Sequence, residues 1–221
     1  MKKKAERFSK RMMQLSIVII SVVMIGLLSA CAKDKLDVKK EVQNSVNKME
    51  QTMDEQVSSE GSVSIEPYDF VKNNEDYEAI IALGWTALPE LKQLLEDAEQ
   101  DSFIEYVYAV ALEQLSKVDL MKESVWKTGK EFLTRYTAYV QEIPEKVETI
   151  VAQFVSDQEK VEQLKALGVP AIPYIFDIIG YGNEELSPAL DYLTDNKSKG
   201  DVNKWGVENV KQLNMLQDLA R

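Results

Sequence analysis

The thiol of Cys31 is the one side chain whose position in this sequence points directly to a reaction. Cys31 is the single cysteine among 221 residues, and it follows the small residues Ser29 and Ala30 at the end of an apolar run over residues 15–28. Six lysines and arginines precede that run. A basic segment, an apolar core and small residues are typical of a secretory signal, and the run is short for a membrane span, which needs about 20 residues. The sequence therefore predicts export.

The segment Leu28-Ser29-Ala30-Cys31 resembles the lipobox of bacterial lipoproteins. The resemblance implies that the Cys31 thiol takes a diacylglycerol, that a peptidase cuts after Ala30, and that the new amine is often acylated. Two acyl chains hold a protein stably on a bilayer, because each buried methylene contributes about 0.8 kcal/mol. We therefore expect a lipid-anchored protein on the extracytoplasmic face of the bacterial cell membrane, with no cofactor apart from these chains. An uncleaved N-terminal anchor and a lone buried cysteine are the simpler alternatives.

The residue types that are absent limit the chemistry of the rest of the chain. The sequence contains no histidine, and no cysteine follows Cys31. Ser-His-Asp catalysis, Cys-His catalysis and histidine zinc sites are therefore excluded. Carboxylates, lysine, tyrosine and hydroxyl side chains remain. No catalytic motif and no metal site is predicted, so we expect a protein that is not an enzyme.

The charge of the exported part excludes further classes. Beyond residue 30 the chain carries 20 basic and 36 acidic residues, a net charge of −16. Nucleic acid is therefore not an expected partner, because its phosphates require cationic surface. Attraction to anionic lipid headgroups is excluded for the same reason, so the lipid on Cys31 must supply the membrane attachment.

Three regions follow along the chain: a signal peptide over residues 1–30, a tether over residues 31–66, and a domain over residues 67–221. Within the tether, apolar residues recur at steps of three and four, which predicts one face of a helix. These residues are Val38, Val42, Val46, Met49, Met53 and Val57. The face is narrow and its flanks are polar, which favours a solvated helix in a spacer. The alternative is a helix that self-associates or packs back on the domain.

From about Tyr68 onward the apolar spacing is helical and no alternating strand pattern is long enough to assign. An all-α domain is therefore predicted, with Pro144 opening one helix in its first turn. The predicted helices cover residues 76–83, 88–97, 103–116, 123–141, 144–156, 159–167, 171–179, 184–193 and 202–219.

An eight-residue segment occurs twice in the domain. Residues 82–89, ALGWTALP, recur as residues 166–173, ALGVPAIP, with five identical positions. In each copy a glycine, Gly84 or Gly168, stands where a helix must reverse, and glycine enters left-handed conformations cheaply. A proline then falls in the first turn of the next helix. The apolar register continues beyond the segment, so Leu91 corresponds to Ile175 and both are expected in the core.

This pattern resembles HEAT-like repeats, which are two-helix units. The resemblance implies stacked helix pairs, either an α-solenoid or an irregular helical bundle, because stacking buries the apolar face that each pair leaves open. The copies lie 84 residues apart, about twice the 40–47-residue period of such repeats. A middle unit with its turn near Gly129 would fill that interval. Residues 201–221, with an apolar stripe from Trp205 to Leu219, are expected to form a capping helix.

Four aromatic residues are the candidate binding residues: Tyr106, Trp126, Tyr136 and Tyr139. Tyr136 and Tyr139 share a helical face, which Trp126 could join. Core packing explains such a cluster, and this is the interpretation we favour. A concave aromatic groove for a peptide or a glycan also explains it, because interfaces favour tyrosine and tryptophan.

Acidic residues supply the remaining candidates. Asp191 and Asp195 share a helix face, and paired carboxylates across a cleft serve glycoside hydrolysis. Residues 195–200 have the glycine spacing of a calcium loop, but Lys197 and Lys199 stand where oxygen ligands are needed. A surface turn is the better interpretation of that segment.

We therefore expect a membrane-anchored, non-enzymatic interaction module for a protein or a cell-envelope polymer. The alternative is a carboxylate-dependent hydrolase acting on envelope glycan or peptide. A capture protein for small solutes is disfavoured, because that role usually requires α/β lobes.

Overall fold

The computed structural model describes residues 38–53, 67–72, 74–99, 101–120 and 125–220. The predicted signal peptide, which ends at Ala30, and the predicted lipid site Cys31 lie outside these residues. Contacts divide the chain into two compact units, Met1–Lys40 and Glu41–Arg221. The second unit contains almost all of the described residues, and the description below concerns it.

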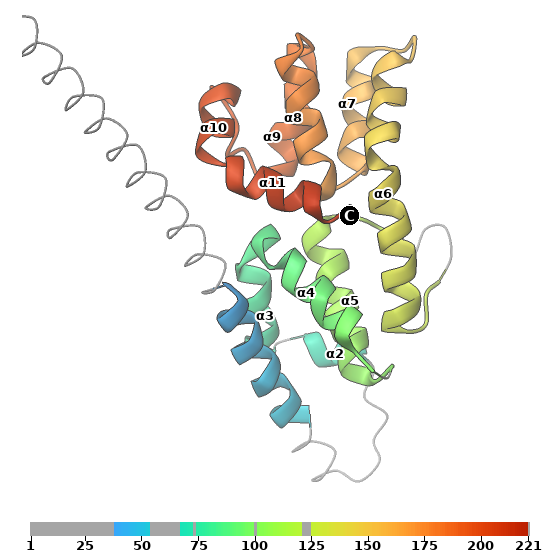
Figure 1. Cartoon of the computed structure of the whole chain (residues 1–221), viewed down its shortest axis with the longest axis vertical. Helices are drawn as coiled ribbons and strands as arrows, with labels where there is room; N and C mark the ends of the chain where they lie inside the picture. Colours follow the sequence, from blue (N-terminus) through green and yellow to red (C-terminus); the bar gives the residue numbers. More distant parts are fainter. Residues whose placement is uncertain (1–37, 54–66, 73, 100, 121–124, 221) are drawn as a thin grey trace, which may run out of the picture. The chain divides into compact units, whose positions relative to one another are not determined.

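The described residues are helical, with short 3-10 turns and no strand, which confirms the all-α prediction (Figure 1). Besides a helix over residues 38–53, the elements are α2 (Pro67–Val71), α3 (Glu75–Ala82), η1 (Gly84–Ala87), α4 (Leu88–Asp97), α5 (Phe103–Ser116), α6 (Gly129–Ala152), α7 (Asp157–Ala166), η3 (Val169–Ala171), α8 (Ile172–Gly180), η4 (Glu184–Leu186), α9 (Ser187–Leu193), α10 (Val202–Glu208) and α11 (Val210–Asp218).

Neighbouring helices pack in succession through the unit. Helix α5 contacts both α4 and α6, which also contact each other, and α9 contacts both α7 and α8. Helix α11 returns across α8 and η3. The apolar stripes of these helices form the core, in which Leu91 and Ile175 are both fully buried, as their register predicts.

Both copies of the repeated segment fold as expected. Gly84 and Gly168 have φ values of 62° and 78°, in the region that favours glycine. A 3-10 turn begins at Gly84 in the first copy and directly after Gly168 in the second, and the next helix has Pro89 or Pro173 among its first residues. The helix, glycine turn and proline-started helix therefore occur twice, as α3–η1–α4 and as α7–η3–α8.

The middle of the domain differs from the prediction. Residues 129–152 form one helix with Pro144 inside it, where the sequence indicated two helices. A proline within a helix costs about 3 kcal/mol or more, but the buried row that includes Val140, Ile143 and Val147 continues through this point. Burial of that row outweighs the lost hydrogen bond. The helix also begins later than predicted: Thr128 caps it, with its side chain accepting from Glu131 N, so Gly129 opens α6.

The C-terminal segment also differs from the prediction, because it forms two helices instead of one. Helices α10 and α11 meet at Asn209, whose amide donates to the Trp205 carbonyl at 2.8 Å. The predicted apolar stripe is buried at Trp205, Leu213, Leu216 and Leu219. Val210 is half exposed, because the break at Asn209 turns it out of the stripe.

The helix over residues 38–53 packs on the domain. Val42, Val46 and Met49 are at most 1% exposed, Glu50 accepts a hydrogen bond from the Tyr108 hydroxyl at 3.3 Å, and Lys48 lies 3.6 Å from Asp76. The favoured interpretation, a solvated spacer helix, is therefore corrected for this segment. No helix among the described residues has the length and apolarity that crossing a membrane requires.

Candidate functional site

The predicted aromatic cluster exists, but it is mostly core. The rings of Trp126 and Tyr106 lie 4.5 Å apart, Trp126 and Phe132 5.0 Å, and Phe132 and Tyr136 5.6 Å. Trp126 and Tyr136 are fully buried, so the groove interpretation is corrected for both of these residues. Burial also raises the pKa of the Tyr136 hydroxyl. This hydroxyl and the Trp126 indole nitrogen have no hydrogen-bond partner among the described residues, a cost that the packing of the rings must offset.

Tyr139 lies apart from this row of rings. Its hydroxyl donates to the Leu167 carbonyl at 3.1 Å, and the Lys146 ammonium lies 4.4 Å from its ring centroid. Tyr139 thus joins α6 to the turn after α7. Of the four predicted residues, Tyr106 lies nearest to a depression in the surface. Its ring packs edge to face on the ring of Tyr68, with the two centroids 6.2 Å apart.

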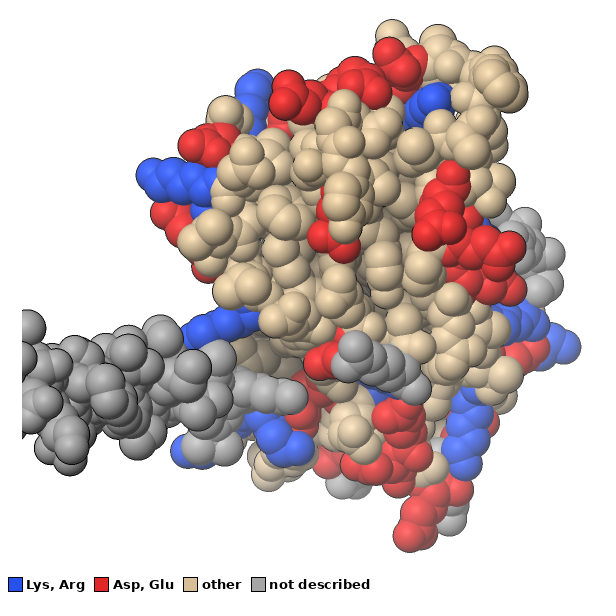
Figure 2. Space-filling model, turned by 45° about the horizontal axis from the view of Figure 1, so that its top comes forward, with Lys and Arg blue, Asp and Glu red and all other residues tan. Residues whose placement is uncertain are grey.

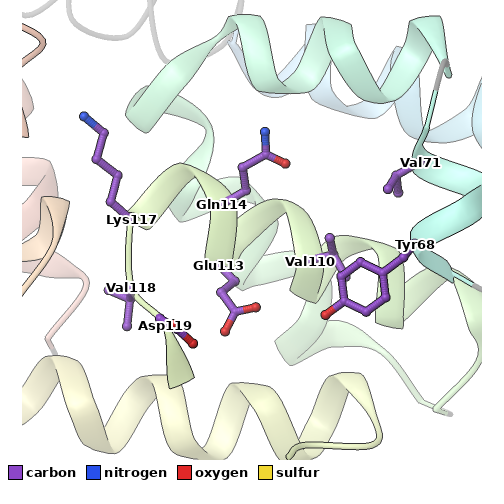
Figure 3. Close-up of a pocket in the computed structure, with 8 residues that line it drawn as sticks. All are labelled: Tyr68, Val71, Val110, Glu113, Gln114, Lys117, Val118 and Asp119. Atoms are coloured by element: carbon purple, nitrogen blue, oxygen red, sulfur yellow. The ribbon is translucent and has the colours of Figure 1, made fainter. Parts of the chain in front are cut away.

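Tyr68 lines a hollow of about 400 Å³ that opens to solvent beside α5 (Figure 3). We call it the α2–α5 hollow. Helix α2 and the residues after α5 form its two ends, and α5 forms its floor. Its lining residues are Tyr68, Val71, Val110, Glu113, Gln114, Lys117, Val118 and Asp119.

Local structure explains why the chain turns at the end of α5. Lys117 has a φ of 53° and caps α5 in the left-handed conformation, which redirects the chain so that Val118 and Asp119 line the hollow. On the other side, the Tyr77 hydroxyl donates to Gln114 Oε1 at 2.7 Å and holds that amide in place. The hollow is therefore built on hydrogen-bonded elements.

Three charged side chains line the hollow: Lys117, Glu113 and Asp119. The Lys117 ammonium donates to Asp195 Oδ1 at 2.7 Å and to the Tyr192 carbonyl at 3.3 Å, and Figure 3 shows it pointing away from the other lining side chains. Glu113 and Asp119 contribute carboxylates, and Glu113 accepts from Leu120 N at 3.1 Å. The lining therefore combines apolar surface with acidic groups.

The phenol of Tyr68 is sensitive to this environment. Burial raises the pKa of Tyr68 to about 12, with smaller contributions from Tyr106 and from the charges of Glu113 and Asp119. The hydroxyl therefore stays protonated at physiological pH.

The two carboxylates of the predicted acidic pair, Asp191 and Asp195, stabilise a turn. Asp191 accepts from the buried Ser198 hydroxyl at 2.7 Å, and Asp195 pairs with Lys117. Asp195 and Asn196 both have positive φ values, which fits the surface turn that we favoured over a calcium loop. Across the described ranges, no group of three or more acidic, histidine or cysteine side chains is placed to hold a metal ion.

Sequence reasoning missed Tyr68, Glu113 and Asp119. A usable signal exists on α5, where Val110, Glu113, Gln114 and Lys117 follow one another at steps of three, one and three and so share a face. Tyr68 could not be joined to that face from sequence, because 42 residues separate Tyr68 from Val110 and no spacing rule spans such a distance.

Comparisons of this chain with protein-family models, with curated proteins and with solved structures find no match.

Proposed function

We propose that this protein is a lipid-anchored lipoprotein of the bacterial cell envelope whose helical domain binds a partner protein in the α2–α5 hollow. The anchor rests on Leu28-Ser29-Ala30-Cys31, which lies outside the described residues. The hollow supports the binding role, because it brings an aromatic edge, apolar walls and two carboxylates together in one open depression. Its volume lies within the range of ordinary ligand sites.

The lining indicates what the partner must present. Tyr68, Val71 and Val110 offer an apolar surface to an apolar side chain, while Glu113 and Asp119 attract a cation. The Lys117 ammonium is bonded to Asp195 and to the end of α9. We therefore propose that the bound segment carries lysine or arginine beside an apolar residue.

The charge of the molecule favours the same partner. The part beyond residue 30 has a net charge of −16, and Figure 2 shows acidic side chains gathered in groups on one face of the domain. A field of one sign speeds encounter with an oppositely charged partner and weakens as salt is added. Binding in the hollow should therefore weaken with rising salt.

Cross-linking from inside the hollow tests this proposal. Tyr68 is 44% exposed and Tyr181, beyond α8, is 87% exposed, so benzoylphenylalanine can replace either residue without opening the core. We expect the Tyr68 position to capture a partner through a peptide that contains lysine or arginine, and the Tyr181 position not to capture that peptide. The combined change Glu113→Gln and Asp119→Asn should reduce the capture at least tenfold. Glutamine keeps the oxygen that accepts from Leu120 N.

Two results would contradict the proposal. One is capture that the neutralised carboxylates leave unchanged, because the acidic groups would then play no part. The other is an adduct of glycan or lipid at Tyr68 in place of peptide.

The same two carboxylates support a second candidate, a hydrolase of envelope glycan or peptide. Glycoside hydrolysis needs two carboxyl groups that face each other across a site, and Glu113 and Asp119 line one hollow. We place this candidate second because a Glu113 oxygen already accepts from the backbone. Release of reducing ends or new amines from envelope material by the purified protein, lost in Asp119→Asn, would favour it.

A further inference from the structure

Because the helix over residues 38–53 packs on the domain, the stretch of chain between the proposed lipid site and the domain is shorter than the whole predicted tether. Val42, Val46 and Met49 are buried, and Figure 1 shows this helix beside α3. Its polar contacts reach both α3 and α5, through the pair Lys48–Asp76 and the hydrogen bond between Tyr108 and Glu50. The chain is therefore attached to the domain from Val42 onward, 25 residues before α2 begins at Pro67.

Backbone geometry converts this attachment into a distance. A chain spans at most about 3.6 Å per residue. From Cys31 to Val42 that limit is about 40 Å, whereas from Cys31 to Pro67 it is about 130 Å. A flexible coil of 11 residues has a mean span of about 18 Å and one of 36 residues about 33 Å, and the helical residues 38–41 shorten the first span slightly.

We infer that residues 41–53 act as a strap that sets how far the domain stands from the membrane. This inference rests on the proposed lipidation of Cys31. With the strap docked, the point where the chain joins the domain lies within about 40 Å of the anchor, whatever the conformation of the residues between them. The domain is then held near the membrane, which favours a partner of the α2–α5 hollow that is embedded in the membrane or held at its surface.

The docked face consists of one narrow apolar row, so it can be disrupted without altering the rest of the core. Val42 and Val46 lie in this row, whereas Asn44 and Asn47 on the same helix are exposed. The double change Val42→Asp and Val46→Asp should release the strap. The matched control, Asn44→Asp and Asn47→Asp, adds the same charge on the solvent side, and the oxygen of residue 47 can still accept from Gln43.

The test measures the height of the domain above a bilayer. The lipidated full chain is reconstituted into phosphatidylcholine vesicles with a dye on a cysteine placed at the exposed Glu148 of α6, and energy transfer to an acceptor in the lipid headgroups reports the height. We expect Val42→Asp with Val46→Asp to raise the mean height by about 15 Å and the control pair to leave it unchanged. Inserting 25 Gly and Ser residues between Lys33 and Asp34 should raise the height similarly without altering the docked face.

The outcomes separate this inference from the proposed function. A wild-type height that neither the released strap nor the insertion increases would overturn the strap. A protein that does not bind the vesicles and carries no lipid on Cys31 would overturn the proposed anchor. Folding of each variant is checked by its helical circular dichroism, and the insertion keeps the test informative if the aspartate pair unfolds the domain.

Discussion

Gly84 and Gly168 hold the same position in two copies of one helix–turn–helix unit, and their surroundings differ sharply. Among the described residues, no atom beyond the chain neighbours of Gly84 lies within 4 Å of a Cβ built on it, whereas one built on Gly168 would lie 2.5 Å from the Ser116 carbonyl oxygen and 2.7 Å from Val118. The residue after each glycine shows the same contrast. Trp85 is partly exposed and stacks on Trp205 at 6.5 Å, while Val169 is 3% exposed.

The difference shows what a repeated segment determines and what its neighbours determine. Glycine and proline chemistry is local, so both copies adopt the same turn. The second turn, however, lies against the end of α5, where a Cβ on its glycine would meet Ser116, Lys117 and Val118. Two of these residues line the α2–α5 hollow. The turn of the second copy thus supports the wall of the candidate site directly, whereas the first copy reaches the site through α3, whose Tyr77 hydroxyl donates to Gln114.

The largest effect is expected where the two copies are alike. Leu91 and Ile175 are both fully buried at the same register, so Leu91→Asp and Ile175→Asp each place a carboxylate in apolar surroundings. Each should lower the free energy of unfolding by more than about 4 kcal/mol, a large fraction of the stability of a typical domain. Denaturant titration measures the loss, and wild-type stability in either variant would contradict the equivalence of the two cores.

A second pair of substitutions separates the copies. Gly168→Ala should cost about 3 kcal/mol or more, because a backbone oxygen and Val118 obstruct the new methyl group and the left-handed φ adds 1–2 kcal/mol. Gly84→Ala should cost only the φ strain of about 1–2 kcal/mol. Equal losses of unfolding free energy in the two variants would show that the turns have equivalent surroundings.

These elements also show where sequence reasoning succeeds. The repeated turns were predictable because a positive-φ glycine and a first-turn proline depend on their own residues. The continuity of α6 through Pro144 was not, because it depends on the burial of Val140, Ile143 and Val147 against distant helices. Trp126 posed a different problem. Helical spacing groups aromatic residues on a face, but the same spacing serves a core and a groove.

The candidate site was the least predictable part. Its lining comes from α2 and from α5 with the residues after it, and only tertiary packing brings these segments together. The docked helix was in part predictable, since its apolar row was evident from the sequence. The sequence contained no feature that identifies the surface covering that row.

The smallest expected loss of stability comes from the residue that follows the glycine of the first turn, Trp85. Trp85→Val gives the first copy the residue of the second and removes the stack on Trp205. We expect a loss of about 1 kcal/mol, the typical contribution of an aromatic pair, without any change in cross-linking from Tyr68. A change in that cross-linking would mean that the first turn also shapes the hollow.

The proposed attachment of this domain to a membrane, where it would bind its partner, is tested most directly at the N-terminus of the protein isolated from cells. Mass spectrometry of the protein extracted from bacterial membranes should find residues 1–30 absent and Cys31 carrying diacylglycerol. Cys31→Ala should abolish incorporation of a palmitate analogue. A chain that retains residues 1–30 with a free Cys31 thiol would contradict the proposed attachment.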